Sequence, residues 1–231
     1  MPNEVLFFLS IILYFGGVLL FRYLFGLKGL YVWTAIAAIS ANIEVMILIN
    51  AFHMDQTLGN VMFASSFLVT DIISENYGKK EANTAVSIGI FTSLMFIFIS
   101  KMWLIFTPAP ADWAMPHIKA IFSNTPRITC VSFLVYAISQ RFDVWAYHKW
   151  WNYTEKKFKN KDKYLWLRNN GSTLVSQLIN TILFTFFAFY KVFPNEALIE
   201  VFESTYIIYI VTSLLDTPAV YLARKIKPRD E

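Results

Sequence analysis

Long apolar blocks, separated by short polar stretches, run along the whole chain. Each block approaches the roughly 20 residues that a helix needs to cross the hydrocarbon core of a bilayer. The blocks are continuously apolar and lack the alternation of membrane β-strands, so they predict an all-α, polytopic transmembrane helical bundle of six to seven spans. The candidate spans are Val5–Phe21, Leu30–Ile49, Val61–Glu75, Ala85–Phe106, Ile128–Tyr147, Ser172–Tyr190 and Ser204–Ala223.

The third candidate, Val61–Glu75, is short and ends in charge. If it crosses the membrane the bundle has seven spans; if it is re-entrant or lies along the interface, six remain and the first two invert. Basic residues concentrate in cytoplasmic loops, and the seven-span arrangement places 16 of the 20 Lys and Arg residues on the side of the C-terminus. The other side, or span ends facing it, receives Lys101, Lys119, Arg127 and Lys191. This distribution predicts a cytoplasmic C-terminus and, with seven spans, an external N-terminus.

Composition agrees with a membrane protein. Of the 231 residues 56% are hydrophobic and 16% are charged, whereas soluble domains carry about 25% charged residues. We expect one transmembrane transporter domain over residues 1–231. Val5–Phe21 has no basic residue before it and no small-residue cleavage site after it, which indicates a retained span and not a signal peptide. The single cysteine, Cys130, lies in an apolar stretch and is expected to be a buried packing residue.

Two connecting segments carry distinctive residues. His148–Arg168 holds seven basic residues interleaved with aromatic side chains. Aromatic residues and lysines beside a span are typical anchors at the membrane interface, so we interpret this segment as a cytoplasmic loop and expect no nucleic-acid partner. Thr107–Asn124 contains three prolines and is expected to be an external loop with a short interfacial helix.

Several acidic residues lie at bilayer depth. Each costs roughly 2.5–3.5 kcal/mol on insertion scales and normally faces a protein interior or an aqueous path. Asp71 and Glu75 are four residues apart, which stacks them on one helix face suited to a cation, a proton or an amine. The alternative is that Glu75 reaches the cytoplasmic headgroups and Asp71 pairs with an arginine elsewhere in the bundle. Glu44 and Asp216 are further acids within spans.

Polar stripes follow the fifth and sixth spans. In the fifth, helical spacing aligns Ser132, Tyr136, Gln140 and Asp143, with Arg127 at the external entrance. In the sixth, two adjacent rows are formed by Ser172, Ser176 and Asn180 and by Thr173, Gln177 and Thr181. Amide side chains donate and accept hydrogen bonds, so they suit the edge of a heterocycle. The alternative is hydrogen bonding between helices.

Constellations typical of soluble enzymes are absent from the sequence. The stretch 78–80, Gly-Lys-Lys, lacks the spacing of a phosphate-binding loop. His53, His117 and His148 are scattered, without a second ligand at helical spacing. We therefore expect no cofactor, no metal site and no use of ATP by this chain alone.

Three segments together resemble a known family. They are Phe63–Gly78 with its Thr-Asp pair, the stretch from Ser132 to Val144 with Tyr-x-x-x-Gln-x-x-Asp-Val, and Ser172–Thr181 with Ser-Thr-x-x-x-Gln. The combination is similar to that of the bacterial and archaeal queuosine precursor transporters, earlier grouped as vitamin-uptake transporters. The resemblance covers most of the chain from about residue 42 to residue 223.

The resemblance implies inward transport of a 7-deazaguanine across the cell membrane, which is the inner membrane in a Gram-negative cell. The cargo would be 7-cyano-7-deazaguanine, 7-aminomethyl-7-deazaguanine or queuine, used to modify transfer RNA. One departure is Asn180, where the family commonly has an acid. That departure puts the coupling or the substrate choice of this chain in doubt.

We hypothesise a central pocket between the third, fifth and sixth spans. Asp71 would bind the guanine-like edge or relay a proton, and Tyr136 would stack on the flat ring. The expected pocket residues are Asp71, Glu75, Arg127, Tyr136, Gln140, Asp143, Gln177 and Asn180.

Two rival classes stay open. One is a vitamin-type substrate-binding subunit that needs an energising partner. The other is an intramembrane enzyme or structural membrane protein whose buried acids serve catalysis or assembly, although the sequence has no paired histidines and no activated serine to support an enzyme. The expected partners are a small-molecule substrate and membrane lipid, with a homo-oligomer or an energising subunit left open.

Overall fold

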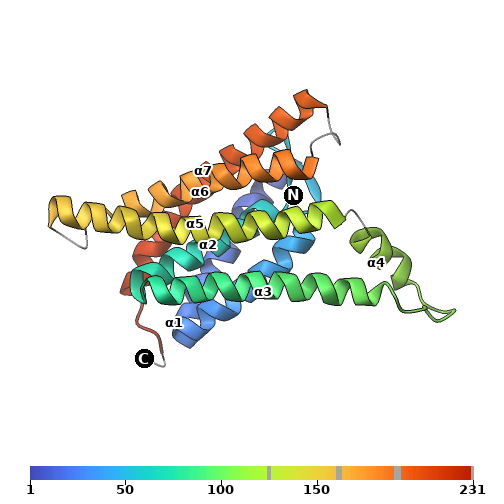
Figure 1. Cartoon of the computed structure of the whole chain (residues 1–231), viewed down its shortest axis with the longest axis horizontal. Helices are drawn as coiled ribbons and strands as arrows, with labels where there is room; N and C mark the ends of the chain where they lie inside the picture. The colour runs from blue at the N-terminus through green and yellow to red at the C-terminus, as the bar shows by residue number, and fades with distance from the viewer. Residues whose placement is uncertain (124–125, 160–162, 190–193, 230–231) are drawn as a thin grey trace.

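A computed structural model of the chain describes residues 1–123, 126–159, 163–189 and 194–229. These residues form an elongated bundle of helices with a small β-hairpin at one end (Figure 1). The predicted all-α membrane bundle is thereby confirmed, with the hairpin as an addition. The elements are α1 (Asn3–Glu44), β1 (Leu48–Ala51), β2 (Met54–Thr57), α2 (Gly59–Asn76), α3 (Lys79–Trp103), α4 (Ala114–Phe122), α5 (Pro126–Phe158), α6 (Leu165–Phe189) and α7 (Asn195–Lys225).

α1 contains the first two predicted spans, joined by a sharp turn at Gly26. This residue has φ 56° and ψ −135°, which lies outside the helical region and which residues with a Cβ atom rarely adopt. The two halves lie side by side, as shown by the hydrogen bond of 3.2 Å that the Tyr14 hydroxyl donates to Glu44 Oε1. Two spans therefore follow one another with almost no loop between them.

Gly29 allows the two halves of α1 to approach closely at this turn. A Cβ atom at residue 29 would lie 2.1 Å from the carbonyl oxygen of Phe21. We expect Gly29→Ala to lower the free energy of unfolding by about 2 kcal/mol or more, which a lower melting temperature in detergent would report. Gly16→Ala is the matched control, because a Cβ there meets nothing within 4 Å. Equal melting temperatures for the two variants would contradict the tight turn.

The second span ends earlier than the sequence predicts. A helix over Leu30–Ile49 is wrong, because α1 ends at Glu44 and β1 follows, antiparallel to β2. The turn between the strands places Phe52 at φ 56° and His53 at φ 59°. Glycine and asparagine normally occupy such positions. Because neither is present here, the sequence gives no sign of a turn, and the apolar run before it is predicted as part of a helix.

α2, the third predicted span, occupies the centre of the bundle. Fifteen of its 18 residues are buried, so it is surrounded by protein and not by lipid. It runs the full depth: Leu58 N donates to the Ile47 carbonyl beside the hairpin, and Asn76 Oδ1 accepts from Arg22 at the other end. This course favours the seven-span arrangement over a re-entrant segment. The two chain ends accordingly lie at opposite ends of the bundle (Figure 1).

α5 continues well beyond the predicted fifth span. The interpretation of His148–Arg168 as a loop is wrong, because α5 extends to Phe158 and α6 begins at Leu165. The residues from 148 to 158 contain no Gly or Pro, so nothing ends the helix there. The aromatic and basic side chains of this extension contact one another: Lys157 Nζ lies 5.6 Å from the centre of the Tyr153 ring.

Two further expectations concern the segments around α4. The short helix expected within Thr107–Asn124 is present as α4, and none of its side chains is buried. The expectation that Cys130 is buried is wrong, because its side chain is exposed near the start of α5. An apolar sequence neighbourhood does not tell a lipid-facing position from a core position.

The outer surface of the bundle is apolar, as a lipid-facing surface requires. Phe91, Phe98 and Ile105 are exposed along and just beyond α3, while polar residues such as Asp71 are buried inside. In the described part of the chain α1, α3, α6 and α7 are long and apolar enough to cross a membrane. This inside-out distribution of polarity makes the chain a multi-pass membrane protein.

Candidate functional site

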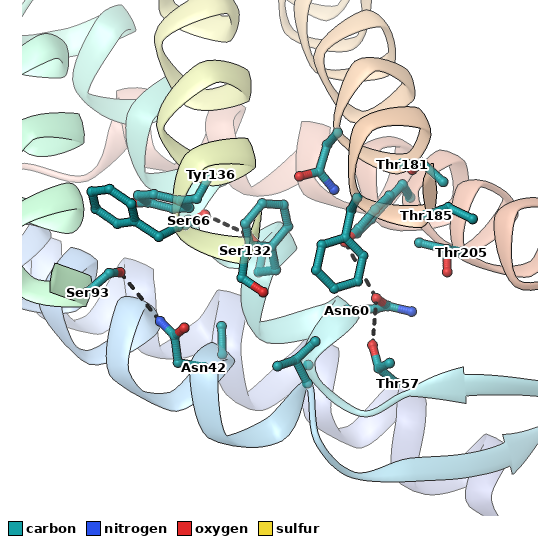
Figure 2. Close-up of a pocket in the computed structure, with 18 of the residues that line it drawn as sticks. Asn42, Thr57, Asn60, Ser66, Ser93, Ser132, Tyr136, Thr181, Thr185 and Thr205 are labelled. Carbon is teal, nitrogen blue, oxygen red and sulfur yellow. Dashed lines mark hydrogen bonds between the residues drawn. The ribbon is translucent and has the colours of Figure 1, made fainter. Parts of the chain in front are cut away.

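A pocket lies at the hairpin end of the bundle, where α1, α2, α3, α5, α6 and α7 converge (Figure 2). The pocket and its open mouth together hold about 840 Å³ of space, open solvent included. The polar residues in its wall are Asn42, Thr57, Asn60, Ser66, Ser93, Ser132, Tyr136, Asn180, Thr181, Thr185, Thr205 and Tyr209.

Aromatic rings from three helices frame the pocket. The ring centre of Phe63 on α2 lies 5.9 Å from that of Tyr136 on α5 and 6.0 Å from that of Tyr209 on α7. Phe67, one turn further along α2, packs edge-on against Phe63 at 5.3 Å. Ring faces of this kind stack on flat aromatic molecules.

Two polar atoms in the pocket wall have no protein partner among the described residues. Asn60 Oδ1 accepts hydrogen bonds from Thr57 at 3.0 Å and from Tyr209 at 3.5 Å, but its Nδ2 is buried and unpartnered. Ser132 Oγ, across the pocket on α5, is likewise buried and unpartnered. Buried polar groups in folded proteins are nearly always hydrogen-bonded. These two groups are therefore available to a bound molecule.

Hydrogen bonds between α2, α5 and α6 close the floor of the pocket. Gln140 Nε2 donates to Ser66 Oγ at 2.7 Å, and Gln140 Oε1 accepts from Thr70 at 3.3 Å. Ser139, next to Gln140, donates to Asn180 Oδ1 at 3.4 Å. The side chain of Gln140 is fully buried, so the floor separates the pocket from the layers below.

A layer of buried acids lies beneath this floor. Thr173 Oγ1 donates to Asp71 Oδ2 at 3.1 Å, and Ser176 Oγ donates to Asp143 Oδ1 at 2.8 Å. Asp216, from α7, is also buried, with 1% of its surface exposed. The layer thus contains three carboxyls, one each from α2, α5 and α7.

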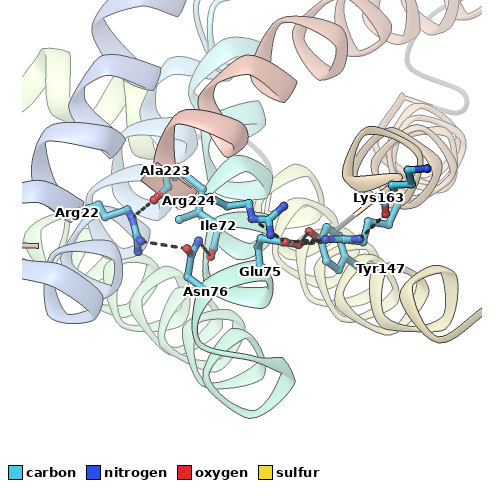
Figure 3. Close-up of polar contacts among 9 residues, drawn as sticks. Arg22, Ile72, Glu75, Asn76, Tyr147, Lys163, Ala223 and Arg224 are labelled. Atoms are coloured by element: carbon cyan, nitrogen blue, oxygen red, sulfur yellow. Dashed lines mark hydrogen bonds and ion pairs between the residues drawn. The ribbon is translucent and has the colours of Figure 1, made fainter. Parts of the chain in front are cut away.

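An ion cluster centred on Glu75 closes the opposite end of the bundle (Figure 3). Arg168 Nη2 lies 2.6 and 2.7 Å from the two carboxylate oxygens of Glu75, and Arg168 Nε lies 3.0 Å from Oε2. The Tyr147 hydroxyl donates to the same carboxylate at 2.6 Å, and Arg224 Nε lies 3.4 Å away. The Arg168 guanidinium also lies 4.2 Å from the centre of the Trp151 ring. Glu75 thereby joins α2 to α5, α6 and α7.

Of the eight predicted pocket residues, the structure places Tyr136 and Asn180 in the pocket wall and Gln140 directly beneath it. Arg127 lies in the first turn of α5, and its side chain is outside the described residues.

The other four predicted residues lie deeper. Asp71, Asp143 and Gln177 are buried below the floor, with at most 1% of each residue exposed. Glu75 belongs to the ion cluster and is far enough down α2 that it does not line the pocket. The sequence pattern therefore identified one polar column, which the structure divides into a pocket, an acid layer and a closing cluster.

Sequence reasoning missed several residues that build these layers. Asn60 and Tyr209 were not singled out because each is a lone polar residue in an apolar block. Arg168 was counted only as a basic loop residue, yet it is fully buried against Glu75. The two asparagines that follow Arg168, Asn169 and Asn170, were the sequence signal that could have marked this region as buried. In the structure Asn169 Nδ2 donates a hydrogen bond to Asp216 Oδ1 at 2.7 Å.

Comparison with known proteins now bears on this arrangement. Residues 57–223 match the family model described as "Putative vitamin uptake transporter". The chain belongs to this family. A relative from Bacillus subtilis (strain 168), named "Probable queuosine precursor transporter", is 39% identical over 220 residues, which are 95% of this chain and 94% of the relative. No solved structure matches the chain.

Family membership confirms the resemblance seen in the three sequence segments. Together with the apolar helices it makes the chain a multi-pass membrane transporter for a small molecule in a lipid environment. The matched region contains α2, α3, α5 and α6 in full and the pocket residues of α7.

Proposed function

We propose that this transporter imports queuosine precursors, that is 7-cyano-7-deazaguanine, 7-aminomethyl-7-deazaguanine or queuine, and that they bind in the pocket at the hairpin end. One observation carries the proposal. A chain 39% identical to a relative named as a queuosine precursor transporter has a pocket that pairs the rings of Phe63, Tyr136 and Tyr209 with unpartnered polar atoms of Asn60 and Ser132.

The chemistry of the pocket suits a 7-deazaguanine. The substrate is a flat heterocycle with hydrogen-bond donors and acceptors along one edge. The aromatic rings supply faces for stacking, and the amides of Asn60 and Asn180 both donate and accept. We assign the contacts with the substrate to Tyr136 and Asn180, together with Phe63 and Asn60, and leave Gln140 the role of holding the floor beneath them.

We further propose that the end with the Glu75 cluster faces the cytoplasm and that the pocket faces the outside. The C-terminus lies at the Glu75 end, since Arg22 near the turn of α1 donates to the carbonyl oxygens of Ala223 and Ile226. Sixteen of 20 basic residues fall on this side, and basic residues favour the cytoplasm. The described state is then open outward, with the floor and the Glu75 cluster closing the inward path.

This orientation predicts which positions a membrane-impermeant thiol reagent reaches from outside. In a Cys130→Ser background, Thr205→Cys in the pocket wall should be labelled in intact cells, and 7-cyano-7-deazaguanine should slow the labelling. Ser74→Cys is the control, because Ser74 is buried below the floor with 1% exposed and should stay unlabelled. Labelling of Thr205→Cys only in inside-out vesicles would reverse the orientation.

Gly89 on α3 gives a test of Tyr136 that leaves Tyr136 itself intact. A Cβ atom at residue 89 would lie 2.1 Å from the Tyr136 hydroxyl oxygen. We expect Gly89→Ala to displace the ring and to weaken the apparent affinity for 7-cyano-7-deazaguanine by about tenfold, equivalent to about 1.4 kcal/mol. Adding Tyr136→Phe, which removes the hydroxyl, should restore part of the affinity. An unchanged affinity in Gly89→Ala would remove Tyr136 from the site.

The proposed function is tested in cells that neither make the deazaguanine nor possess a transporter for it. Expression of this chain with nanomolar 7-cyano-7-deazaguanine in the medium should restore queuosine in transfer RNA, measured by mass spectrometry of the nucleosides. Asn60→Ala, at equal membrane abundance, should need a higher precursor concentration. No rescue by well-inserted wild type would refute the proposal.

A further inference from the structure

The acid layer beneath the pocket contains more carboxyls than its surroundings can hold in the charged form. Asp71 and Asp143 are 0% exposed and Asp216 is 1% exposed. Asp71 is bonded by Thr173 and Asp143 by Ser176, which lie one turn apart on α6, so the two carboxyls face the same stretch of that helix. Carboxylates that share a dry site without a cation cannot all be ionised.

The hydrogen bonds around this pair are incomplete. Asp71 accepts a hydrogen bond from Thr173 and Asp143 accepts one from Ser176, and the hydroxyls of Ser172 and Thr173 also lie near the Asp143 carboxyl. Asp71 Oδ1 and Asp143 Oδ2 are buried and have no partner among the described residues. Gln177 Oε1, one helical turn above Thr173 on α6, is buried and unpartnered as well. The two unpartnered carboxyl oxygens lack a donor as long as both acids are ionised, and a proton on one carboxyl is the smallest such donor.

In the described part of the chain, the ion pairs nearest this layer are those of Glu75 with Arg168 and Arg224. The groups acting on Asp71 are Asp143 of α5 and Asp216 of α7, and Asp71 itself acts on Tyr147 of α5. α6 contributes one cation near the acid layer, Arg168. It is bound to Glu75, which is the next acid after Asp71 along α2.

We infer that Asp71 and Asp143 form a proton-binding site and that the entry of this proton drives import of the substrate. The inference rests on the proposed function. A metal ion fits the layer less well, because no group of three His, Cys, Asp or Glu residues in the described part of the chain could hold one. Each import cycle carries one proton from the outside to the cytoplasm on the paired carboxyls, with no covalent step.

The position of Asp71 explains how the proton and the substrate are linked. α2 carries Asn60 and Phe63 in the pocket, Asp71 in the acid layer and Glu75 in the closing cluster. A rearrangement that opens the inward path must move this helix against α5 and α6. When the pair holds a proton, the layer carries one negative charge less, and the helices can rearrange between the outward-open and the inward-open state. When both carboxyls are ionised, the same rearrangement would move unpaired charge through an apolar interior.

The test uses the purified full chain in liposomes, with labelled 7-cyano-7-deazaguanine as the uncharged probe and the membrane potential clamped by potassium and valinomycin. Counterflow, the exchange of internal and external probe without any gradient, measures the transport function alone. Uptake driven by an acidic exterior measures the coupling. For one proton per substrate, a gradient of about two pH units should give accumulation of up to about 100-fold. A sodium gradient should give none.

We expect Asp143→Asn and Asp71→Asn to keep counterflow and to lose accumulation driven by pH. Glu44→Gln, an acid bonded to Tyr14 and remote from the layer, should keep both. Wild-type counterflow without stimulation by pH would overturn the inference and leave the proposed function standing, as would Asp143→Asn that still accumulates the probe. Wild type without counterflow would overturn the proposed function and the inference with it.

Discussion

Arg168→Met is expected to abolish transport and to lower the free energy of unfolding by about 3–5 kcal/mol, the cost of leaving one partner of a buried ion pair behind. The Glu75 side chain is 2% exposed and Arg168 is 0% exposed, so water cannot replace the lost guanidinium. Arg224 is 3.4 Å from Glu75 and its side chain is 28% exposed, which makes it a weaker partner. Unfolding by titration with dodecyl sulfate measures the loss.

The double variant Glu75→Gln/Arg168→Met separates the two contributions. It removes both charges while an amide oxygen at residue 75 can still accept from Tyr147. Its stability should therefore recover most of what the single variant loses, since replacing both partners of a buried pair costs less than removing one. If Arg168→Met unfolds at the wild-type denaturant concentration, Glu75 is solvated in solution and its end of the bundle is not closed as described.

Phe63→Leu is expected to weaken binding of 7-cyano-7-deazaguanine about tenfold or more, because stacking of a base on an aromatic side chain contributes about 1–3 kcal/mol. Phe63 is the ring shared by the Tyr136 and Tyr209 contacts. Leucine keeps an apolar side chain of similar bulk but offers no ring face. Isothermal titration with purified protein provides the affinity.

Phe63→Tyr is the matched control for this prediction. It keeps the ring, its edge-on contacts with Phe67 and Tyr136 and its tilted contact with Tyr209. We expect its affinity to stay within about threefold of wild type, well inside the span of a lost stacking contact. Equal losses in Phe63→Leu and Phe63→Tyr would mean that the pocket shape, and not ring stacking, sets the affinity.

Much of the fold could be predicted from the apolar blocks, because a bilayer leaves few alternatives to a helix. Each of the seven predicted spans corresponds to a helix or half-helix of the bundle. The errors lie where this constraint ends. Outside the bilayer, Phe52 and His53 form a turn with positive φ that their residue types do not announce. The prediction of a loop after residue 147, where α5 in fact extends to Phe158, fails for a related reason. Charged residues are as typical of an exposed helix as of a loop.

The site could be predicted only as a set of polar residues, and not as layers. Helical spacing places Tyr136, Gln140 and Asp143 on one stripe, but depth along that stripe decides whether a residue lines the pocket or lies below it. The pairing of Glu75 with Arg168 joins residues 93 positions apart, which no local pattern encodes. Residues such as Asn60 acquire a role only through the helices that surround them.

The central claim is that the pocket at the hairpin end binds a queuosine precursor, and equilibrium binding of 7-cyano-7-deazaguanine to purified protein tests it most directly. Wild type should bind one molecule per chain. Asn60→Ala should weaken binding about tenfold, the cost of one lost hydrogen bond to a buried polar group, while Gly16→Ala, remote from the pocket, should match wild type. Binding by wild type that Asn60→Ala and Phe63→Leu leave unchanged would place the substrate elsewhere, and a wild type that does not bind would contradict the account as a whole.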